Sequence, residues 1–486
     1  HIYLRTCAEA FGIWFSAPGE GVSHPVHAHH FGRPGDFLLG SDSHTCAAGA
    51  LGMIGIGAGS FDVAAALAGE PFHLPRPKVR RITLLGAPPD RVGAKDAILT
   101  LLGRYGVAGA KGFVLEYDGP GVAAFGVMER MAIANMGAEM GATASVFPSD
   151  ARTLAFLTHA GRPEVWQELS ADPDARYDEN DTFDLSKLEP MIARPSSPDD
   201  VVTVRSVAGT PVGQAYIGSS ASPGFQDVAR VAALMNGRPK ASGVSLDVNP
   251  ATRAALMGLV ATGGMASLLQ SGARFHQIGC NGCNGMGQAP GSRVNSLRTV
   301  PRNFPGRSGT VDDKVWLCGP ETAAAAALTG EITDPRDIEG AGPDAAEFPP
   351  HSDATRLVPP GNGPADGIQR GPNIARLRLN EPVRGKQTLP VLLHLGDNIS
   401  TDAISPAGVE ALALRSDPDK LADFTFRRSH PDYVARARAA SGGHVIVAGQ
   451  NMGQGSSREH ATLCPRCLLY TSPSPRDLIA HLVCRL

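Results

Sequence analysis

Short apolar runs that stop at glycine or polar residues dominate the hydrophobic pattern of this chain. Phe37-Leu38-Leu39 is followed directly by Gly40-Ser41-Asp42-Ser43-His44-Thr45, which predicts a short buried strand with polar side chains at its carboxyl end. Open α/β sheets place their chemistry at that end of their strands. The remaining elements predicted from the pattern are strands at 81–85, 113–117, 390–394 and 443–448 and a helix at 127–139. We therefore expect an α/β fold.

The same pattern divides the chain into successive units. Three α/β units and a last, separate unit are expected at 1–77, 78–198, 199–345 and 389–466. The segment 346–388 is rich in Pro, Gly and Asp and lacks periodicity, which is typical of an interdomain linker. Residues 467–486 break abruptly with the preceding pattern, and we interpret them as a non-native tail. Because the chain also opens at His1 without an initiator Met, we interpret it as a fragment.

Charge and composition narrow the function classes. The 44 Lys and Arg are balanced by 47 Asp and Glu, and no basic run stands out, so nucleic acid is not expected as a partner. No apolar stretch is long enough to predict a membrane span. The eight cysteines show no disulfide spacing, which favours a reducing, cytoplasmic location. The mitochondrial matrix stays open as an alternative because the start of the protein is not seen.

Cys280-Asn281-Gly282-Cys283 is the motif that points most directly to chemistry. Two thiols at this spacing in a turn can face one site, and Gly282 removes a side chain that would crowd them. The spacing alone leaves three interpretations open, namely a zinc site, an iron–sulfur cluster and a redox dithiol.

Two polar motifs at predicted element ends each have a structural and a functional interpretation. Asp42 and His44 either cap a turn or form an acid/base pair in which the carboxylate orients the imidazole. The string Gly455-Ser456-Ser457-Arg458 precedes a predicted helix, so its hydroxyls either cap that helix or help to bind an anion at its positive end.

Two further motifs are charged or titratable. Arg302 and Arg307 lie on one loop and are interpreted either as surface charges or as a bidentate clamp for carboxylates. The histidines between His24 and His30 lack a carboxylate or Cys at metal-ligand spacing and are expected in a solvated loop.

Taken together, these strings resemble the aconitase / isopropylmalate dehydratase family of iron–sulfur hydro-lyases, from the N-terminus to about Arg466. The motifs that carry the resemblance are GSDSHT at 40–45, NMGAEMGAT at 135–143, SVFP at 145–148, CNGC at 280–283, RNFPGR at 302–307, TDAISPAG at 401–408 and GSSREH at 455–460. The resemblance implies that the first three units form an α/β core around a cluster, and that the last unit begins a swivel domain that closes over it.

The resemblance also assigns roles to residues. It implies Ser456 as the catalytic base, Asp42, His44 and His24 as acid/base elements, Glu139 as a carboxylate beside the hydroxyl-bearing iron and Asp402 as a residue that orients the site. It implies that the substrate is bound by Ser43, Arg302, Arg307, Ser457 and Arg458. It places Asn135 beside a 4Fe-4S cluster whose thiolate ligands include Cys280 and Cys283.

The pattern departs from the family at the cluster itself. Ser220 stands where the resemblance places a third cysteine ligand, and a Ser oxygen is a harder, more basic donor that holds iron less well than a thiolate does. Pro301, Ala47 and Ala403 replace other family residues. A family arginine falls at Leu414, next to Arg415. Three interpretations stay open: a cluster with a substitute ligand, a hydro-lyase with another metal or none, and a paralogue that has lost catalysis and kept a binding or regulatory role.

The resemblance therefore implies reversible dehydration of a hydroxy-tricarboxylate such as citrate or isocitrate through cis-aconitate. The fused last unit and the RNFPGR loop favour the aconitase branch, and with it the tricarboxylic acid cycle. The expected partner is a small di- or tricarboxylate substrate, and the protein is expected to be a monomer.

Overall fold

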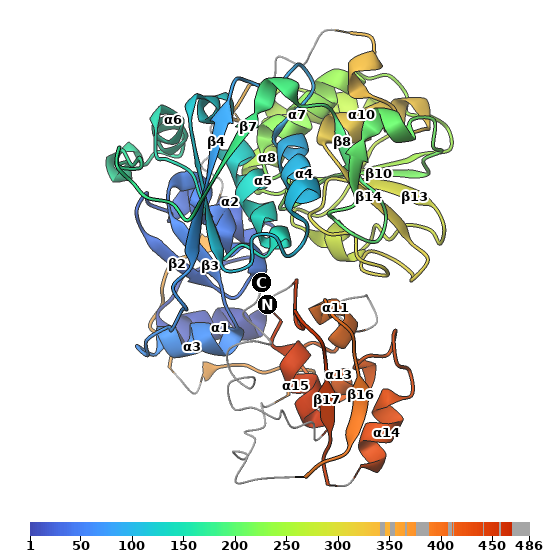
Figure 1. Ribbon diagram of the computed structural model, residues 1–486. Helices are drawn as coiled ribbons and strands as arrows, with labels where there is room; N and C mark the ends of the chain where they lie inside the picture. Colours follow the sequence, from blue (N-terminus) through green and yellow to red (C-terminus); the bar gives the residue numbers. More distant parts are fainter. Residues whose placement is uncertain are drawn as a thin grey trace.

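The three-dimensional structure is a computed structural model that describes residues 1–340, 346–349, 355–364, 367–375, 388–406, 411, 413–440, 442–455 and 458–468. Figure 1 shows two bodies: a large α/β core built from the N-terminal two thirds of the chain, and a smaller C-terminal unit, coloured orange to red, beside it. Mixed helices and parallel sheets confirm the expected α/β class. No helix of the described residues is long and apolar enough to cross a membrane.

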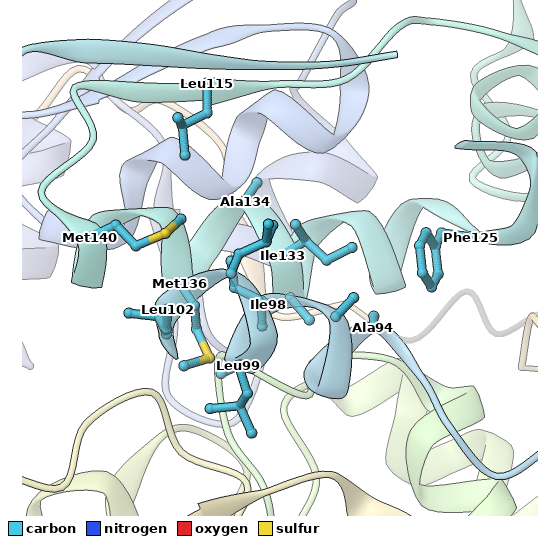
Figure 2. Close-up of a cluster of buried hydrophobic side chains, with 14 of the residues drawn as sticks. Ala94, Ile98, Leu99, Leu102, Leu115, Phe125, Ile133, Ala134, Met136 and Met140 are labelled. Carbon is cyan, nitrogen blue, oxygen red and sulfur yellow. The ribbon is translucent and has the colours of Figure 1, made fainter. Parts of the chain in front are cut away.

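A four-stranded parallel sheet forms one part of the core. In sheet order its strands are β6 (Ala144–Val146), β5 (Phe113–Asp118), β4 (Lys78–Leu85) and β7 (Glu179–Asp184). Helices α4 (Ala94–Tyr105) and α5 (Val127–Gly137) pack together through apolar side chains, among them Ile98 and Ile133 (Figure 2). The strands predicted at 81–85 and 113–117 are confirmed, and the predicted helix 127–139 is α5 continued by a 3-10 turn, η3 (Ala138–Met140).

A seven-stranded sheet forms the other part of the core. Its strands are, in order, β12 (Arg274–Phe275), β11 (Ser245–Asn249), β10 (Gln214–Gly218), β13 (Asn295–Arg298), β14 (Lys314–Cys318), β8 (Met191–Ala193) and β9 (Val201–Thr203). The first five are parallel, and β8 and β9 join antiparallel. The predicted unit 78–198 thus contributes β8 to the sheet of the predicted unit 199–345.

The helices that accompany these sheets are α1 (Ile2–Phe11), α2 (Ser23–His30), α3 (Ser60–Leu67), α6 (Ala151–His159), α7 (Phe225–Met235), α8 (Arg253–Ala261), α9 (Gly264–Gln270) and α10 (Pro320–Thr329). Short 3-10 helices are η1 (Ser43–Leu51), η2 (Pro120–Ala124), η4 (Pro163–Val165), η5 (Leu185–Lys187), η6 (Val204–Val207), η7 (Asn281–Asn284) and η8 (Pro335–Asp337). A small antiparallel ladder pairs β1 (Phe15–Ser16) with β15 (Leu357–Val358).

Two local predictions near the N-terminus need correction. The strand after residue 36 exists as β2 (Phe37–Gly40), paired in parallel with β3 (Ile54–Gly57), but it is not buried, because Phe37 is 60% exposed at the edge of a two-stranded sheet. The histidine-rich segment is not a solvated loop. It forms helix α2, because Pro25, Val26 and Ala28 are buried and hold it against the core.

The C-terminal unit has its own core. β16 (Val391–His394) and β17 (Val445–Val447) pair in parallel and confirm the two strands predicted there. Its helices are α11 (Thr401–Ile404), α13 (Pro418–Leu421), η10 (Ala422–Phe424), α14 (Tyr433–Ala439) and α15 (His460–Cys467). Most of the predicted tail lies outside the described residues, and the predicted linker is described only in part.

Candidate active site

The loop after β2 brings one carboxylate against two imidazoles. Asp42 is the N-cap of η1, and its Oδ1 accepts a hydrogen bond from the backbone N–H of His44 at 2.8 Å. The same oxygen lies 3.5 Å from Nδ1 of His44 and 3.4 Å from Nε2 of His24, which comes from α2. Burial would raise the pKa of Asp42, but hydrogen bonds with His24 and His44 outweigh it and hold that pKa well below its usual range. The three predicted acid/base elements therefore lie together.

A glycine-rich run makes this arrangement possible. β3 passes directly beneath η1, and a Cβ on Gly55 would lie 2.2 Å from the carbonyl oxygen of Thr45. Only glycine permits so close an approach of the two backbones. The run 52–59 thus serves to pack a strand under the Asp42–His44 turn.

Glu139 connects the acid/base pair to the predicted carboxylate clamp. Its Oε1 lies 2.9 Å from Nε2 of His44, and both of its oxygens accept from Nε of Arg302, at 2.7 and 2.9 Å. Nη2 of Arg302 also donates to Oγ of Ser43 at 2.9 Å. Burial would raise the pKa of Glu139, but the Arg302 charge and the His44 hydrogen bond lower it to about 2. Glu139 is therefore a permanent anion that orients His44 and Arg302 together.

The charge balance around His44 favours its protonated form. Burial and the Arg302 guanidinium would lower the pKa of His44, but Asp42 and Glu139 outweigh them and raise it above its ordinary value. A buried imidazolium held between two carboxylates can hold a proton near neutral pH and release it to a leaving group.

The two thiols of the CxxC motif lie in a 3-10 turn beside a serine hydroxyl. Cys280 Sγ is 3.7 Å from Oγ of Ser220, which follows strand β10. A Cβ on Gly282 would lie 2.3 Å from the ring of Tyr216, so glycine lets the turn pack on that ring. The Cys280 thiol and the Arg307 guanidinium hold the pKa of Cys283 well below its usual range, with Arg307 Nη2 at 3.3 Å from Cys283 Sγ.

Buried polar atoms without partners occur on α5 and directly after Cys283. Both side-chain atoms of Asn135, Nδ2 and Oδ1, and Oδ1 of Asn284 are buried with no hydrogen bond within the described part of the chain. Leaving a buried polar group unpaired costs on the order of 1–3 kcal/mol. The neighbours of Asn135 on α5 belong to the same packed cluster as Cys280 and Cys283. Two thiols, a hydroxyl and unpaired amides fit a bound iron–sulfur cluster, with the Ser220 oxygen as the weak member of the donor set.

The C-terminal unit adds charged groups to the same site. Asp402, at the start of α11, accepts from Arg307 Nη1 at 3.1 Å and from Arg458 Nη2 at 2.9 Å. Burial would raise the pKa of Asp402, but Arg458 and Arg307 outweigh it and hold that pKa well below its usual range. Arg428 donates to the carbonyls of Pro305 and Gly306, at 3.1 and 2.7 Å. Ser456 and Ser457 lie outside the described residues, so their predicted roles stay predictions.

Sequence reasoning missed Arg298. Its guanidinium is fully buried and donates to the carbonyl of Gly282 at 2.6 Å and to Oε1 of Gln214 at 2.8 Å. Arg298 therefore stabilises the CxxC turn through a hydrogen bond to its backbone. The available signal was one charged residue inside the otherwise uncharged strand segment 295–300.

Residues 2–330 match the family model described as Aconitase family (aconitate hydratase). The chain belongs to the aconitase family. Relatives in this family include 3-isopropylmalate dehydratase large subunit 2 of Archaeoglobus fulgidus, 38% identical over 339 residues (69% of this chain, 81% of the relative). The 3-isopropylmalate dehydratase large subunit of Oleidesulfovibrio alaskensis is 41% identical over 309 residues (63% and 73%).

A probable methanogen homoaconitase large subunit of Methanosarcina mazei is 37% identical over 322 residues, covering 66% of this chain and 81% of the relative. Among solved structures, aconitase X of Thermococcus kodakaraensis (holo-form) gives a TM-score of 0.39 at 14% identity, covering 64% of this chain and 72% of that one.

These relatives confirm the family, and two expectations find no support in them. Their names denote isopropylmalate dehydratases and a homoaconitase, so the citrate-specific assignment and the tricarboxylic acid cycle have no support from them. Their names also denote large subunits, which is at odds with the expected monomer.

Proposed function

We propose that this aconitase-family protein is a hydro-lyase that reversibly removes water from a hydroxy-di- or tricarboxylate. The observation that carries the proposal is the His44–Glu139–Arg302 chain, in which one buried carboxylate orients a proton-bearing imidazole and a guanidinium. Removal of water from such an acid needs both a carboxylate-binding cation and a proton for the departing hydroxyl.

The relatives favour a 3-isopropylmalate-like substrate, a hydroxy-dicarboxylate with an apolar branch. Homoaconitate-like acids are the second choice suggested by the relatives. Citrate and isocitrate remain the candidates suggested by the fused C-terminal unit and the RNFPGR loop. The three classes share the two carboxylates and the hydroxyl that the site would handle.

We assign substrate binding and the two proton transfers to the following residues. Arg302 binds a substrate carboxylate through the guanidinium face turned away from Glu139, and Arg458 holds a second carboxylate from the C-terminal unit. His44, held by Asp42 and Glu139, gives its proton to the hydroxyl, which leaves as water. Ser456, by its family position, takes the proton from the carbon next to a carboxylate, so that the electron pair of that C–H bond forms the double bond.

An iron–sulfur cluster would be held by Cys280 and Cys283, with Ser220 as the third donor and the unpaired amide of Asn135 as a polar neighbour. When bound, such a cluster supplies a Lewis acid for the substrate hydroxyl. Arg307, which contacts Cys283 and Asp402, links this donor set to the C-terminal unit.

A small-subunit partner is also proposed, because the relatives are large subunits. The C-terminal unit already brings Asp402 and Arg458 to the site. Co-purification of a tagged chain from its native host, with the molar mass measured by light scattering, tests whether a separate chain joins it. A single species with the mass of one chain would contradict the partner.

A catalytically inactive binding protein is the second candidate, and the observation in its favour is Ser220 at a cluster position. One experiment distinguishes the hydro-lyase from the inactive binding protein. The protein is reconstituted anaerobically with iron and sulfide and then assayed with 3-isopropylmalate, homoisocitrate and isocitrate. The unsaturated product is followed by its ultraviolet absorbance, and iron and sulfide per chain are measured in parallel.

Arg302→Lys serves as the test variant and Arg438→Lys, on an exposed ion pair with Asp423, as its matched control. We expect turnover of one acid, a fall in kcat/KM of about a hundredfold for Arg302→Lys because a single ammonium group cannot bind Glu139, Ser43 and a substrate carboxylate in the geometry of the guanidinium, and no change for the control. Tight binding of an acid without turnover by the iron-loaded protein would favour the inactive candidate. If the protein neither binds nor turns over any of these acids, the proposal is overturned.

A further inference from the structure

Lys95 occupies an unusual position for a lysine. It is the second residue of α4 and is only 3% exposed, next to the buried Ala94 and one turn before the buried Ile98 and Leu99 (Figure 2). The positive end of the helix macrodipole disfavours a cation in the first turn. Burial lowers the pKa of Lys95 to about 8. A methionine of similar length would avoid these costs, so the ammonium group serves a purpose that an apolar side chain cannot serve.

The ammonium group binds two successive backbone carbonyls. Nζ donates to the carbonyl oxygen of Thr299 at 3.1 Å and to that of Val300 at 3.0 Å. No carboxylate within the described ranges lies at ion-pair distance from Nζ. In an extended strand successive carbonyls point to opposite sides, so two carbonyls that converge on one cation mark a bend directly after β13.

That bend sets the position of Arg302. Pro301 follows the two carbonyls and restricts the backbone further, because its ring fixes its own φ and limits the residue before it. Arg302 then enters the site with 1% exposure and binds Glu139 and Ser43. Within the described residues no hydrogen bond engages its Nη1, which leaves that group for a substrate carboxylate.

The segment 298–302 also contacts the CxxC turn and the loop that carries Ser220. Arg298 donates to the carbonyl of Gly282 in the CxxC turn. The Thr299 hydroxyl donates to the Gly218 carbonyl at 2.7 Å and accepts from the Gly218 N–H at 2.9 Å, two residues before Ser220. Residues 298–302 therefore join the thiol turn, the Ser220 loop and the carboxylate clamp, and Lys95 fixes the middle of that segment.

We propose that Lys95 is a positioning residue for substrate binding, which places the Arg302 guanidinium by holding the bend at Thr299 and Val300. The proposal rests on the proposed function, because its effect is read at the carboxylate clamp. Lys95 itself does not touch substrate. Its removal weakens the binding of carboxylates and leaves the proton-transfer groups on Asp42 and His44 in place.

The test is a comparison of Lys95→Met with Lys187→Met in the cluster-loaded protein. Lys187 is an 81% exposed lysine side chain in η5 and serves as the matched control. We expect Lys95→Met to raise KM for the acid that the wild type turns over, and the Kd of the non-reacting probe tricarballylate, about tenfold or more, with kcat changed less than about threefold. Lys95→Gln, which can donate to one of the two carbonyls, should lie between Lys95→Met and the wild type.

A double-mutant cycle with Arg302→Lys decides whether Lys95 acts through Arg302. Residues that act through one contact are non-additive, so the double variant should bind tricarballylate no more than about twofold worse than Arg302→Lys alone. Additive losses, or an unchanged KM together with a lower melting temperature, would overturn the proposal and leave Lys95 a purely structural residue.

Hydrogen exchange keeps the two proposals apart. If the wild type neither turns over the acids nor binds tricarballylate, the proposed function fails while the positioning of the bend is still testable. Amides of residues 299–303 should then exchange about tenfold faster in Lys95→Met than in Lys187→Met, with β4 unchanged in both. Equal exchange in the two variants would overturn the positioning role.

Discussion

Ser220 Oγ and Cys280 Sγ lie 3.7 Å apart, so a hydroxyl and a thiol from loops sixty residues apart in sequence share one corner of the site. The hydroxyl comes from the end of β10 and the thiol from the turn η7, and Cys283 completes the group. Alkoxide oxygen binds iron less well than thiolate does. The strength with which the proposed iron–sulfur cluster would be held therefore depends on the identity of one side chain.

Ser220→Cys should increase cluster retention, because it supplies a third thiolate at a position already in contact with Cys280. After anaerobic reconstitution, iron and sulfide per chain should rise relative to the wild type, and iron loss in air should slow about tenfold, because a thiolate holds iron better than a Ser oxygen does. The control is Ser222→Cys, a buried thiol of the same size two residues away. Equal iron retention in the wild type and Ser220→Cys would show that Ser220 does not face the cluster.

Glu139→Gln should shift the alkaline limb of the pH–rate profile to lower pH. The Glu139 charge favours the protonated form of His44 and raises the pKa of that imidazole. Removing the charge lowers the pKa of His44, so the imidazole loses its proton earlier as pH rises, and activity falls at a lower pH. The measurement is kcat/KM against pH, with Glu9→Gln, on an exposed ion pair with Arg5, as control. An alkaline limb that stays in place would mean that His44 is not the group that titrates there.

Asp402→Asn should loosen the contact between the core and the C-terminal unit. Asp402 is buried and bridges Arg307 and Arg458, so its neutralisation leaves two buried guanidiniums without their counter-charge. Breaking a buried pair from one side costs on the order of 3–5 kcal/mol. Thermal unfolding should begin at a lower temperature. The exposed Asp423, paired with Arg438, offers the control, and Asp423→Asn should change stability by less than about 1 kcal/mol. Similar melting curves for both variants would contradict the bridging role.

Arg428→Ala should weaken substrate binding from outside the core. The Arg428 guanidinium binds the carbonyls of Pro305 and Gly306, on the loop between the two clamp arginines. Its loss removes two charge-assisted hydrogen bonds of about 1.5–3 kcal/mol each from the loop, and KM should rise several-fold. Arg438→Ala, which removes an exposed ion pair with Asp423 in the same unit, is the control. An unchanged KM would mean that Arg428 does not help to position Arg302 and Arg307.

Much of this protein could be predicted from its sequence. Strands such as 113–117 and the helix at 127–139 could be predicted because apolar side chains recur at the spacing of each element. The family motifs name nearly all the charged groups that meet in the site, among them Asp42, His44, Glu139 and Arg302. Such motifs can be recognised in a sequence because the reactive side chains of each are a few adjacent residues at the end of a strand or the start of a helix.

The histidine tract shows where local pattern fails. Four histidines among the seven residues from His24 to His30 indicate a loop, but burial of Pro25, Val26 and Ala28 against the core stabilises a helix. Tertiary packing outweighs local preference there.

What the sequence by itself determined was the family, the α/β class and the inventory of reactive groups, since these depend on local spacing. Only the tertiary structure decided which groups touch. It set Ser220 beside Cys280, joined Glu139 to both His44 and Arg302, and directed the buried Lys95 at the bend before Arg302. These contacts join residues about 60 to 200 positions apart, and no local pattern encodes them because they arise from how the sheets and the C-terminal unit pack together.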